Sequence, residues 1–143
     1  MQLAKAQWAD LIPHKGTMCL LDAVESWDSV SIHATSQSHR MLDNPLRSDD
    51  RLRALHLCEY GAQAMAVHGA LLAQSNKDAA RPGYLVALRA VDLQIERIDD
   101  LPGALEIHAE CLLSDQTAWQ YAFRVHHAGH MLASGRATVM LRD

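Results

Sequence analysis

A single carboxylate, Glu59, stands in a stretch of small and apolar residues and has the clearest potential for chemistry in this sequence. Cysteine, glycine, alanine, methionine and valine fill most of positions 58–70 around it. A carboxylate buried in such surroundings is costly unless it is paired, protonated or used in a reaction. We therefore expect Glu59 to have a raised pKa and to serve in general acid–base chemistry. The alternative is that Glu59 lies at a helix edge and reaches water or a basic partner.

The composition is that of one ordinary globular domain. Its 143 residues suffice for a core, and 49% hydrophobic with 21% charged residues is the usual balance of such domains. The net charge of −4 and the absence of a lysine or arginine run argue against nucleic acid as a partner. Three separate cysteines form no CxxC pair, and no stretch has the pattern of a signal sequence or a membrane span. We expect a reduced, cytoplasmic protein that needs no metal and no cofactor.

The first half of the chain predicts a hairpin followed by one long helix. A strand over residues 18–27 and a half-buried strand over 30–36 are separated by a turn-like pair. The helix is predicted over about residues 51–74, and Asp49 or Asp50 is placed to cap its beginning.

After Gly83 the hydrophobic period changes to two, which is typical of strands. Four strands are predicted, over residues 84–95, 105–112, 119–125 and 130–141. The order of elements favours an α+β domain with an antiparallel sheet of five or six strands. One helix rich in alanine and glycine against one curled sheet indicates a sheet wrapped around the helix, the hotdog arrangement.

Two motifs resemble those of the 3-hydroxyacyl-[acyl-carrier-protein] dehydratases. Residues 11–22 are similar to the opening of that family, which reads roughly L-x-P-H-R-x-P-x-L-L-V-D, and residues 59–66 are similar to its helix motif E-A-x-A-Q. Residues 38–40, 44–46 and 62–69 resemble one branch of it, the dehydratase-like proteins encoded with aryl-polyene or xanthomonadin-type pigment synthesis.

The resemblance implies loss of water from a (3R)-hydroxyacyl thioester, giving a trans-2-enoyl thioester on the phosphopantetheine arm of an acyl carrier protein. In that chemistry a histidine takes the α-proton and a carboxylic acid assists departure of the 3-hydroxyl. Backbone N–H groups at the beginning of the central helix polarise the thioester carbonyl. Glu59 matches the acid of the family by its position in the motif.

The catalytic histidine of the family has no direct counterpart. Typical dehydratases carry it in a G-H-F-P loop about fourteen residues before the acid, where this chain has Pro45. His39, on the same predicted loop, is the nearest upstream candidate for the base. His56, three residues before Glu59 and on the same helix face, is a rival candidate for the base. Its alternative roles are a hydrogen-bond partner for Glu59 or a simple helix-start residue.

Substrate-binding roles are expected for His56, Gln63 and Arg89. Arg89 is implied to bind phosphopantetheine or to pair with Glu59 across a dimer, and an ordinary cross-strand ion pair is equally compatible with its place in an apolar strand. His14 belongs to the first motif, and we expect it to pack or to form a hydrogen bond in its loop rather than to transfer a proton.

Three readings of function stay open: an active dehydratase, a non-catalytic hotdog subunit that pairs with an active one, and an acyl thioesterase. The expected partners are an acyl carrier protein and a second hotdog subunit, identical or different. The long apolar strand after Gly83 is the expected edge of that dimer, because such an edge is a liability when it is left exposed.

Overall fold

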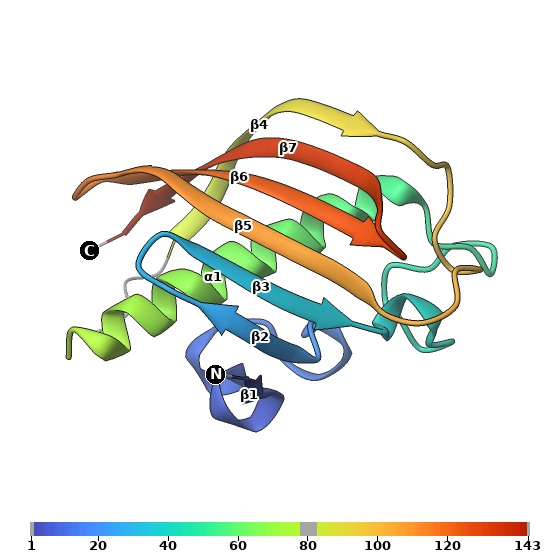
Figure 1. Ribbon diagram of the computed structural model, residues 1–143, viewed down its shortest axis with the longest axis horizontal. Helices are drawn as coiled ribbons and strands as arrows, with labels where there is room; N and C mark the ends of the chain where they lie inside the picture. The colour runs from blue at the N-terminus through green and yellow to red at the C-terminus, as the bar shows by residue number, and fades with distance from the viewer. Residues whose placement is uncertain (1, 78–82, 143) are drawn as a thin grey trace.

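The computed structural model describes residues 2–77 and 83–142 and shows an antiparallel sheet curved around one long helix (Figure 1). The sheet has seven strands in the order β1-β2-β3-β5-β6-β7-β4, and helix α1, Leu57–Ser75, lies along its inner face. The predicted α+β class and the sheet wrapped around a helix are confirmed. The strands are β1 (Leu3–Ala4), β2 (Ala23–Trp27), β3 (Ser31–Ser36), β4 (Gly83–Leu93), β5 (Leu105–Ser114), β6 (Ala118–His127) and β7 (His130–Leu141).

The first strand, predicted over residues 18–27, is shorter than expected. Gly16–Met18 forms a 3-10 turn, and β2 begins only at Ala23. Between them the Leu20 N–H donates to the side-chain Oε1 of Gln63 at 2.8 Å, and the Asp22 N–H donates to the Thr35 carbonyl oxygen of β3 at 2.9 Å. The short strand β1, which pairs with β2, was not predicted, because a strand of two residues shows no hydrophobic periodicity in the sequence.

The predicted helix cap is wrong. Asp49 and Asp50 have φ values of 54° and 60° and lie in a turn, and α1 begins after a further 3-10 turn, Ala54–His56. Tertiary contacts hold the chain out of a helix here: the Leu52 N–H donates to Asp99 Oδ1 at 2.8 Å. A local capping preference is worth about 1 kcal/mol, which long-range pairing can override.

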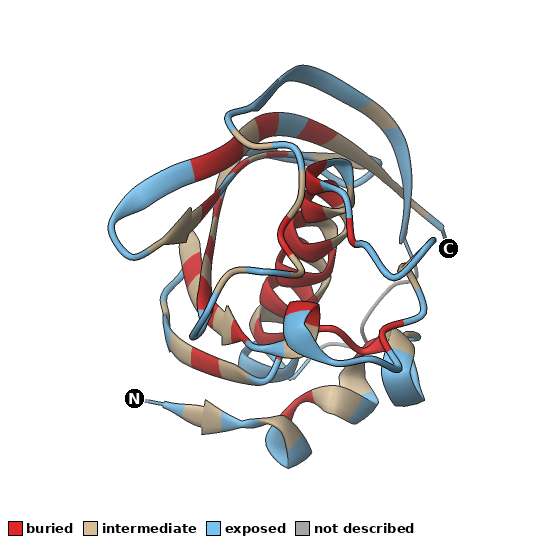
Figure 2. Cartoon of the chain, turned by 90° about the vertical axis from the view of Figure 1, so that its right-hand side faces the viewer, coloured by how far each residue is buried: buried red, intermediate tan, exposed pale blue. Residues whose placement is uncertain are grey.

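Small residues on α1 let the sheet come close. Figure 2 shows the helix as largely buried inside the curve of the sheet. At Gly61 an added Cβ would lie 2.7 Å from the ring of Phe123 on β6, a side chain that is itself 1% exposed. Such a distance is below van der Waals contact, so glycine at this position sets how deeply the helix sits.

Gly61→Ala is therefore expected to destabilise the protein although alanine is the better helix former. Overpacking costs about 1–3 kcal/mol, against a gain of about 1 kcal/mol in helix propensity. We expect a net loss of about 1–2 kcal/mol in the unfolding free energy, measured by denaturant titration. Adding Phe123→Leu to Gly61→Ala should relieve the clash. The loss of unfolding free energy in the double variant should therefore be smaller than the sum of the losses in the two single variants. Simple additivity would contradict the close contact.

Two fully buried histidines lie within the fold. His68 on α1 is 0% exposed, with Nδ1 2.7 Å from the Tyr121 hydroxyl and Nε2 2.8 Å from the Asp28 carbonyl oxygen. A carbonyl only accepts, so Nε2 carries the proton and the Tyr121 hydroxyl donates to Nδ1. His39 is also 0% exposed. Burial lowers the pKa of both residues below the usual 6.5.

Acid should therefore weaken this fold before its carboxylates titrate. The unfolded chain protonates these histidines near pH 6.5, whereas the folded chain binds the protons only at lower pH, so stability falls as pH drops below about 6.5. From pH 7.5 to 5.5 we expect the unfolding free energy to fall, by up to about 1.4 kcal/mol for each histidine that stays unprotonated in the folded chain. His68→Gln should show a smaller loss than wild type over the same interval. A flat profile above pH 5.5 would contradict this account.

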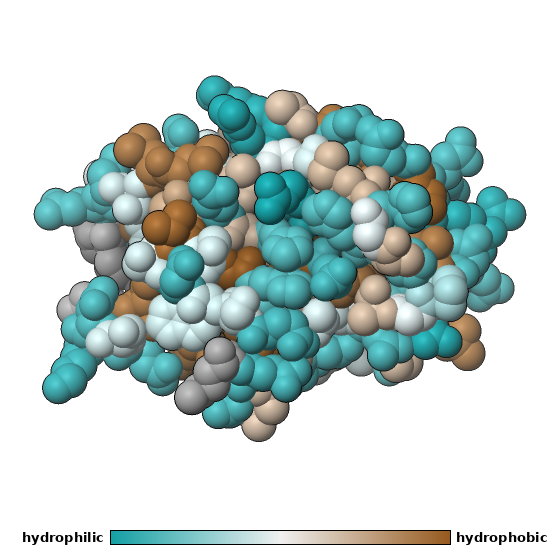
Figure 3. Space-filling view, viewed as in Figure 1, coloured by the Kyte–Doolittle hydropathy of each residue, from teal (hydrophilic) through white to brown (hydrophobic). Residues whose placement is uncertain are grey.

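Strand β4 is a long edge strand that the other described residues leave unpaired on its outer side. It pairs with β7 on one side only and ends the strand order. Its large apolar side chains are 37–48% exposed, in contrast to the outer face of the sheet, which is mostly hydrophilic in Figure 3. These side chains are Tyr84, Leu85, Val86, Leu88, Val91 and Leu93. No helix among the described residues is long and apolar enough to cross a membrane.

Candidate active site

Glu59 lies in the first turn of α1 and reaches out toward the N-terminal segment. Its side chain is 33% exposed. His14 Nε2 lies 3.3 Å from Glu59 Oε1, and the Gln63 amide donates to the same oxygen at 3.1 Å. The predicted pairing of Glu59 with a histidine is therefore present, but the partner is His14, which the sequence motif had assigned only a packing or hydrogen-bonding role.

The expected raised pKa of Glu59 is wrong. The contact with His14 lowers the pKa of this carboxyl most, ahead of burial, which acts in the opposite direction. The hydrogen bond from Gln63 and the charge of His56 lower it further. Position in the first turn of a helix also favours negative charge. Glu59 is thus a carboxylate at neutral pH, because donors surround one of its oxygens while water still reaches the side chain.

Gln63 joins the helix to the segment that carries His14. It is fully buried, one helical turn after Glu59. Its amide nitrogen donates to the Met18 carbonyl at 2.7 Å as well as to Glu59, and its oxygen accepts from the Leu20 N–H at 2.8 Å. These bonds give Gln63 a positioning role. Its predicted contact with substrate stays a prediction.

The segment that bears His14 is fixed by its neighbours. Ile12 and Leu20 are buried on either side of it, and Gly16 takes a φ of 59° that lets the chain turn. The His14 side chain is 27% exposed, and its Nδ1 atom is buried with no hydrogen-bond partner among the described residues. The ring is thus held with Nε2 toward Glu59.

His39, the predicted base, is hydrogen-bonded to a different part of the chain. Its ring Nε2 is 3.0 Å from the Leu101 carbonyl oxygen, and its Nδ1 is buried without a partner in the described part of the chain. Its backbone carbonyl accepts from Arg47 at 3.3 Å. Within residues 2–77 and 83–142, His39 forms neither a hydrogen bond nor an ion pair with Glu59. Its role as base stays a prediction that would need this ring to move.

His56 and Arg89 occupy different surroundings. His56 is the residue before α1, half-buried and close enough for its charge to act on Glu59. Arg89 is exposed on β4, and the residue directly opposite it on β7 is Arg136. A simple ion pair with this cross-strand neighbour is therefore wrong, because both residues are cations. The register of β4 against β7, which are separated in the chain by β5 and β6, could not be read from the sequence.

The helix start offers fewer free N–H groups than the resemblance implied. The Ala54 N–H donates to the Glu96 carbonyl at 2.9 Å, and the N–H groups of His56 and Leu57 donate to carbonyls of the preceding turn. Polarisation of a thioester carbonyl here stays a prediction for the remaining N–H groups.

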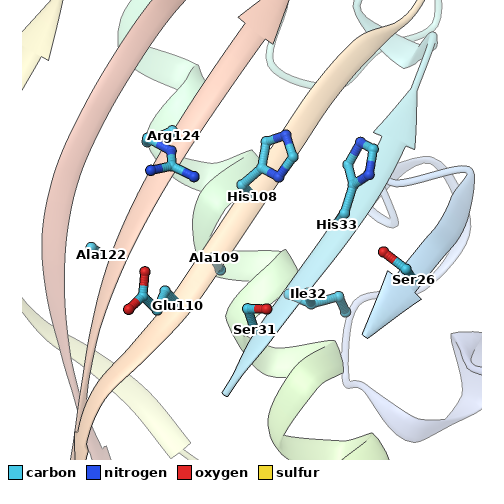
Figure 4. Close-up of a pocket in the computed structure, with 9 residues that line it drawn as sticks. All are labelled: Ser26, Ser31, Ile32, His33, His108, Ala109, Glu110, Ala122 and Arg124. Atoms are coloured by element: carbon cyan, nitrogen blue, oxygen red, sulfur yellow. The ribbon is translucent and has the colours of Figure 1, made fainter. Parts of the chain in front are cut away.

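A groove that does not include Glu59 lies on the outer face of the sheet, away from α1. Figure 4 shows His33, His108 and Arg124 side by side on β3, β5 and β6, lining a groove of about 330 Å³. The rings of His33 and His108 stack at 4.2 Å between centroids, and His33 lies 3.2 Å from Glu106. No group of three or more metal-ligating side chains is present among the described residues. Alternation along β3 and β5 puts His33 and His108 on the same outer face, and the strand register brings them opposite each other.

Comparison with solved structures places this fold among thioesterases and dehydratases. The dehydratase heterocomplex ApeI:P from Xenorhabdus doucetiae matches with a TM-score of 0.83 at 24% identity, over 93% of this chain and 89% of that one. A hypothetical thioesterase with coenzyme A from Streptococcus pneumoniae TIGR4 matches with a TM-score of 0.63 at 11% identity, over 97% of both chains. The conserved protein PA5202 from Pseudomonas aeruginosa gives 0.64 at 16% identity, over 94% and 98%.

Sequence comparison is more specific than these structural likenesses, which at such identities show the fold alone. The search of curated proteins gives no match. The family model described as ApeP-like, ApeP dehydratase, matches residues 6–143, and the chain therefore belongs to the ApeP-like dehydratase family.

Proposed function

We propose that this protein removes water from a (3R)-hydroxyacyl thioester carried by an acyl carrier protein, giving the trans-2-enoyl thioester in polyene or fatty-acid-like synthesis. Membership of a dehydratase family supports the reaction class. The observation that carries the proposal is Glu59, the one carboxylate of α1, which is accessible and is held by His14 and Gln63. A carboxylate held in this way is equipped to move a proton at a bound thioester.

Elimination of water needs one group to take the proton on Cα and one to give a proton to the departing 3-hydroxyl. Glu59 belongs to this pair in either assignment. In the first assignment the other member is His39, which requires its ring to leave the Leu101 carbonyl. In the second assignment Glu59 serves in both steps. The thioester would lie against the exposed side of Glu59, near His56.

A second hotdog subunit is the partner that we propose. The solved relative from Xenorhabdus doucetiae is described as a heterocomplex. In this chain the exposed apolar edge of β4 has the character of an uncovered interface. Arg89 lies on that same strand and is exposed, so a phosphopantetheine arm or a partner subunit can reach it.

A non-catalytic subunit is the second candidate. The missing G-H-F-P loop and the uncovered edge of β4 favour a chain that shapes the site of an active partner. Glu59 and His14 would then serve only to hold the N-terminal segment on the helix.

One assay separates these functions. The purified chain is incubated with 3-hydroxyacyl and 2-enoyl thioesters on acyl carrier protein, alone and with a candidate hotdog partner subunit. Loss of water by the chain alone, abolished by a change at Glu59, supports the proposed dehydratase. Activity only with the partner and unaffected by Glu59 supports the non-catalytic subunit. Release of free acid would instead identify a thioesterase.

A further inference from the structure

Two arginines lie directly opposite each other on the outer face of the sheet. Arg89 on β4 is the cross-strand partner of Arg136 on β7, and both are exposed. Arg136 is in turn opposite Ala122 on β6, which lines the outer groove and so identifies the face to which this row points. The Cβ atoms of such a pair are about 4.5–5.5 Å apart, and like charges placed this way are destabilising.

Arg124 adds a third cation beside this pair. It follows Ala122 by two residues on β6 and therefore lies diagonally across from Arg136, at about 7–8 Å between the backbones, which long side chains can bridge. Strands β4, β7 and β6 are neighbours in the sheet (Figure 1), and Arg124 is exposed on its outer face (Figure 4). We call Arg89, Arg124 and Arg136 the arginine cluster.

The nearest carboxylates by register do not neutralise the arginine cluster. Asp92 lies on β4 beyond a β-bulge that follows Arg89, and its carboxylate accepts from the Gln94 amide at 2.6 Å. Glu110 lies on β5, diagonal to Arg124. In the part of the chain that the structure describes, no guanidinium group of the cluster forms a hydrogen bond or an ion pair with either carboxylate. Three cations against two carboxylates leave an excess of positive charge on this face.

A strained β-bulge sets the position of Arg89. The pairing shifts between Arg89 and Asp92, so that Ala90 and Val91 together oppose the single residue Gly135. Ala90 has a φ of 52°, in the left-handed region that is unfavourable for a residue with a Cβ. Bulges redirect side chains, and strained backbone concentrates at binding sites. The bulge and the opposed charges both act against the free chain, and a bound anion would offset the repulsion.

We propose that Arg89 and Arg136 form a clamp for a phosphate group on the outer face of the sheet, with Arg124 as a third contact. A guanidinium group presents parallel N–H donors that match the oxygens of a phosphate. Two guanidinium groups on opposite sides of one phosphate each donate to it, and its negative charge removes their mutual repulsion. The clamp does not depend on the proposed dehydratase function, because it uses neither Glu59 nor the residues bonded to it.

The phosphate has two possible sources. One is a free phosphate ester, and the other is the phosphodiester of a phosphopantetheine arm on a carrier protein. A second subunit at the edge of β4 would pair through backbone groups in the plane of the sheet, whereas side chains on the outer face stand perpendicular to that plane. Assembly through β4 is therefore compatible with an open clamp.

Inorganic phosphate is the first probe. It is titrated into the purified chain, and the Nε–H resonances of the arginines are followed in ¹H–¹⁵N spectra, with assignments from their loss in Arg89→Gln and Arg136→Gln. We expect saturable shifts at both residues, with a Kd that rises with added sodium chloride because the contact is charged and exposed. Arg136→Gln and Arg89→Gln should each raise Kd at least about tenfold, or about 1.4 kcal/mol.

Arg51→Gln is the matched control, because Arg51 is an exposed arginine on the turn before α1 and outside the sheet. It should leave Kd unchanged. Phosphate also stabilises proteins through its exclusion from their surface, so saturable resonance shifts and not melting temperatures measure the binding. Shifts that do not saturate, or a Kd that Arg51→Gln changes as much as Arg136→Gln does, would overturn the clamp.

The melting temperature without phosphate tests the repulsion separately. Arg136→Gln removes one of two opposed charges, so in phosphate-free buffer it should melt at the same temperature as wild type or higher. A melting temperature several degrees lower would show that the two arginines are not opposed in the free chain and would overturn the reason for the clamp.

The source of the phosphate is identified with pantetheine 4′-phosphate and with carrier protein that bears or lacks its phosphopantetheine arm. Tighter binding of the carrier with its arm, abolished by Arg136→Gln, assigns the clamp to the arm. Binding of the free ester without any effect of the arm assigns it to a free phosphate ester. Failure of inorganic phosphate and both arms to bind overturns the clamp. A chain that binds phosphate through Arg89 and Arg136 but dehydrates nothing keeps the clamp and loses the proposed function.

Discussion

Glu59→Gln is expected to lower the dehydration rate about a hundredfold or more, the usual scale for removing a general acid or base. Glutamine keeps the shape of the side chain and can still contact Gln63, but it cannot carry a proton between Cα and the 3-hydroxyl. The rate is measured as enoyl thioester formed on the acyl carrier protein, at saturating substrate, so that a change in kcat is read directly.

The stability of the same variant is the internal control. The lowered pKa of Glu59 means that its charge contributes stability above about pH 4.5 and loses it as pH falls further. Because the side chain is a third exposed, that contribution is small, and Glu59→Gln should cost less than about 1 kcal/mol at pH 7. A folded variant with full activity would remove Glu59 from the mechanism and favour the non-catalytic subunit.

Local periodicity explains why much of this fold could be predicted. The strands predicted over residues 105–112 and 119–125 followed from clean alternation of apolar and polar side chains, which a sheet with one buried face requires, and they lie within β5 and β6. The strand predicted over residues 130–141 coincides with β7. Glu59 and Gln63 were found together because four residues make about one helical turn, so a single motif places both on one face.

Contacts between distant segments could not be predicted in this way. His14 is 45 residues before Glu59, and only the route of the N-terminal segment under the helix brings the two together. Their presence in two motifs of one resemblance was the available signal. His39 looked suitable from its place on the loop, but the Leu101 carbonyl, 62 residues away, holds its ring. For the same reason the sequence did not reveal that Arg89 on β4 lies opposite Arg136 on β7.

The pKa of Glu59 shows why burial alone does not predict the direction in which the pKa of a carboxyl shifts. An apolar neighbourhood in the sequence predicts desolvation, which raises the pKa of a carboxyl. Donors from outside the helix act the other way, and here they prevail. The direction of the pKa shift therefore depends on His14, a partner that helix periodicity does not reveal.

Leu88→Lys is expected to weaken assembly through β4 at least a hundredfold in Kd, or about 2.7 kcal/mol. Leu88 is 38% exposed at the centre of β4, which has no neighbouring strand on its outer side among residues 2–77 and 83–142. If a second hotdog subunit covers this strand, a lysine there must be desolvated without a partner, which costs several kcal/mol. In a chain that no second subunit covers, the same lysine stays in water and should leave the unfolding free energy almost unchanged.

Light scattering after size exclusion measures the result. The wild-type chain, alone or with its partner subunit, should have about twice the 15.8 kDa mass of one chain at micromolar concentration, whereas Leu88→Lys should give separate chains. Val30→Lys is the matched control, because Val30 is 47% exposed but lies at the turn between β2 and β3. A wild type that stays monomeric in both settings, or a Leu88→Lys protein that assembles normally, would show that the β4 edge is not the interface. The exposed apolar side chains of β4 would then need another cover, since an edge of this length and character invites aggregation when nothing pairs with it.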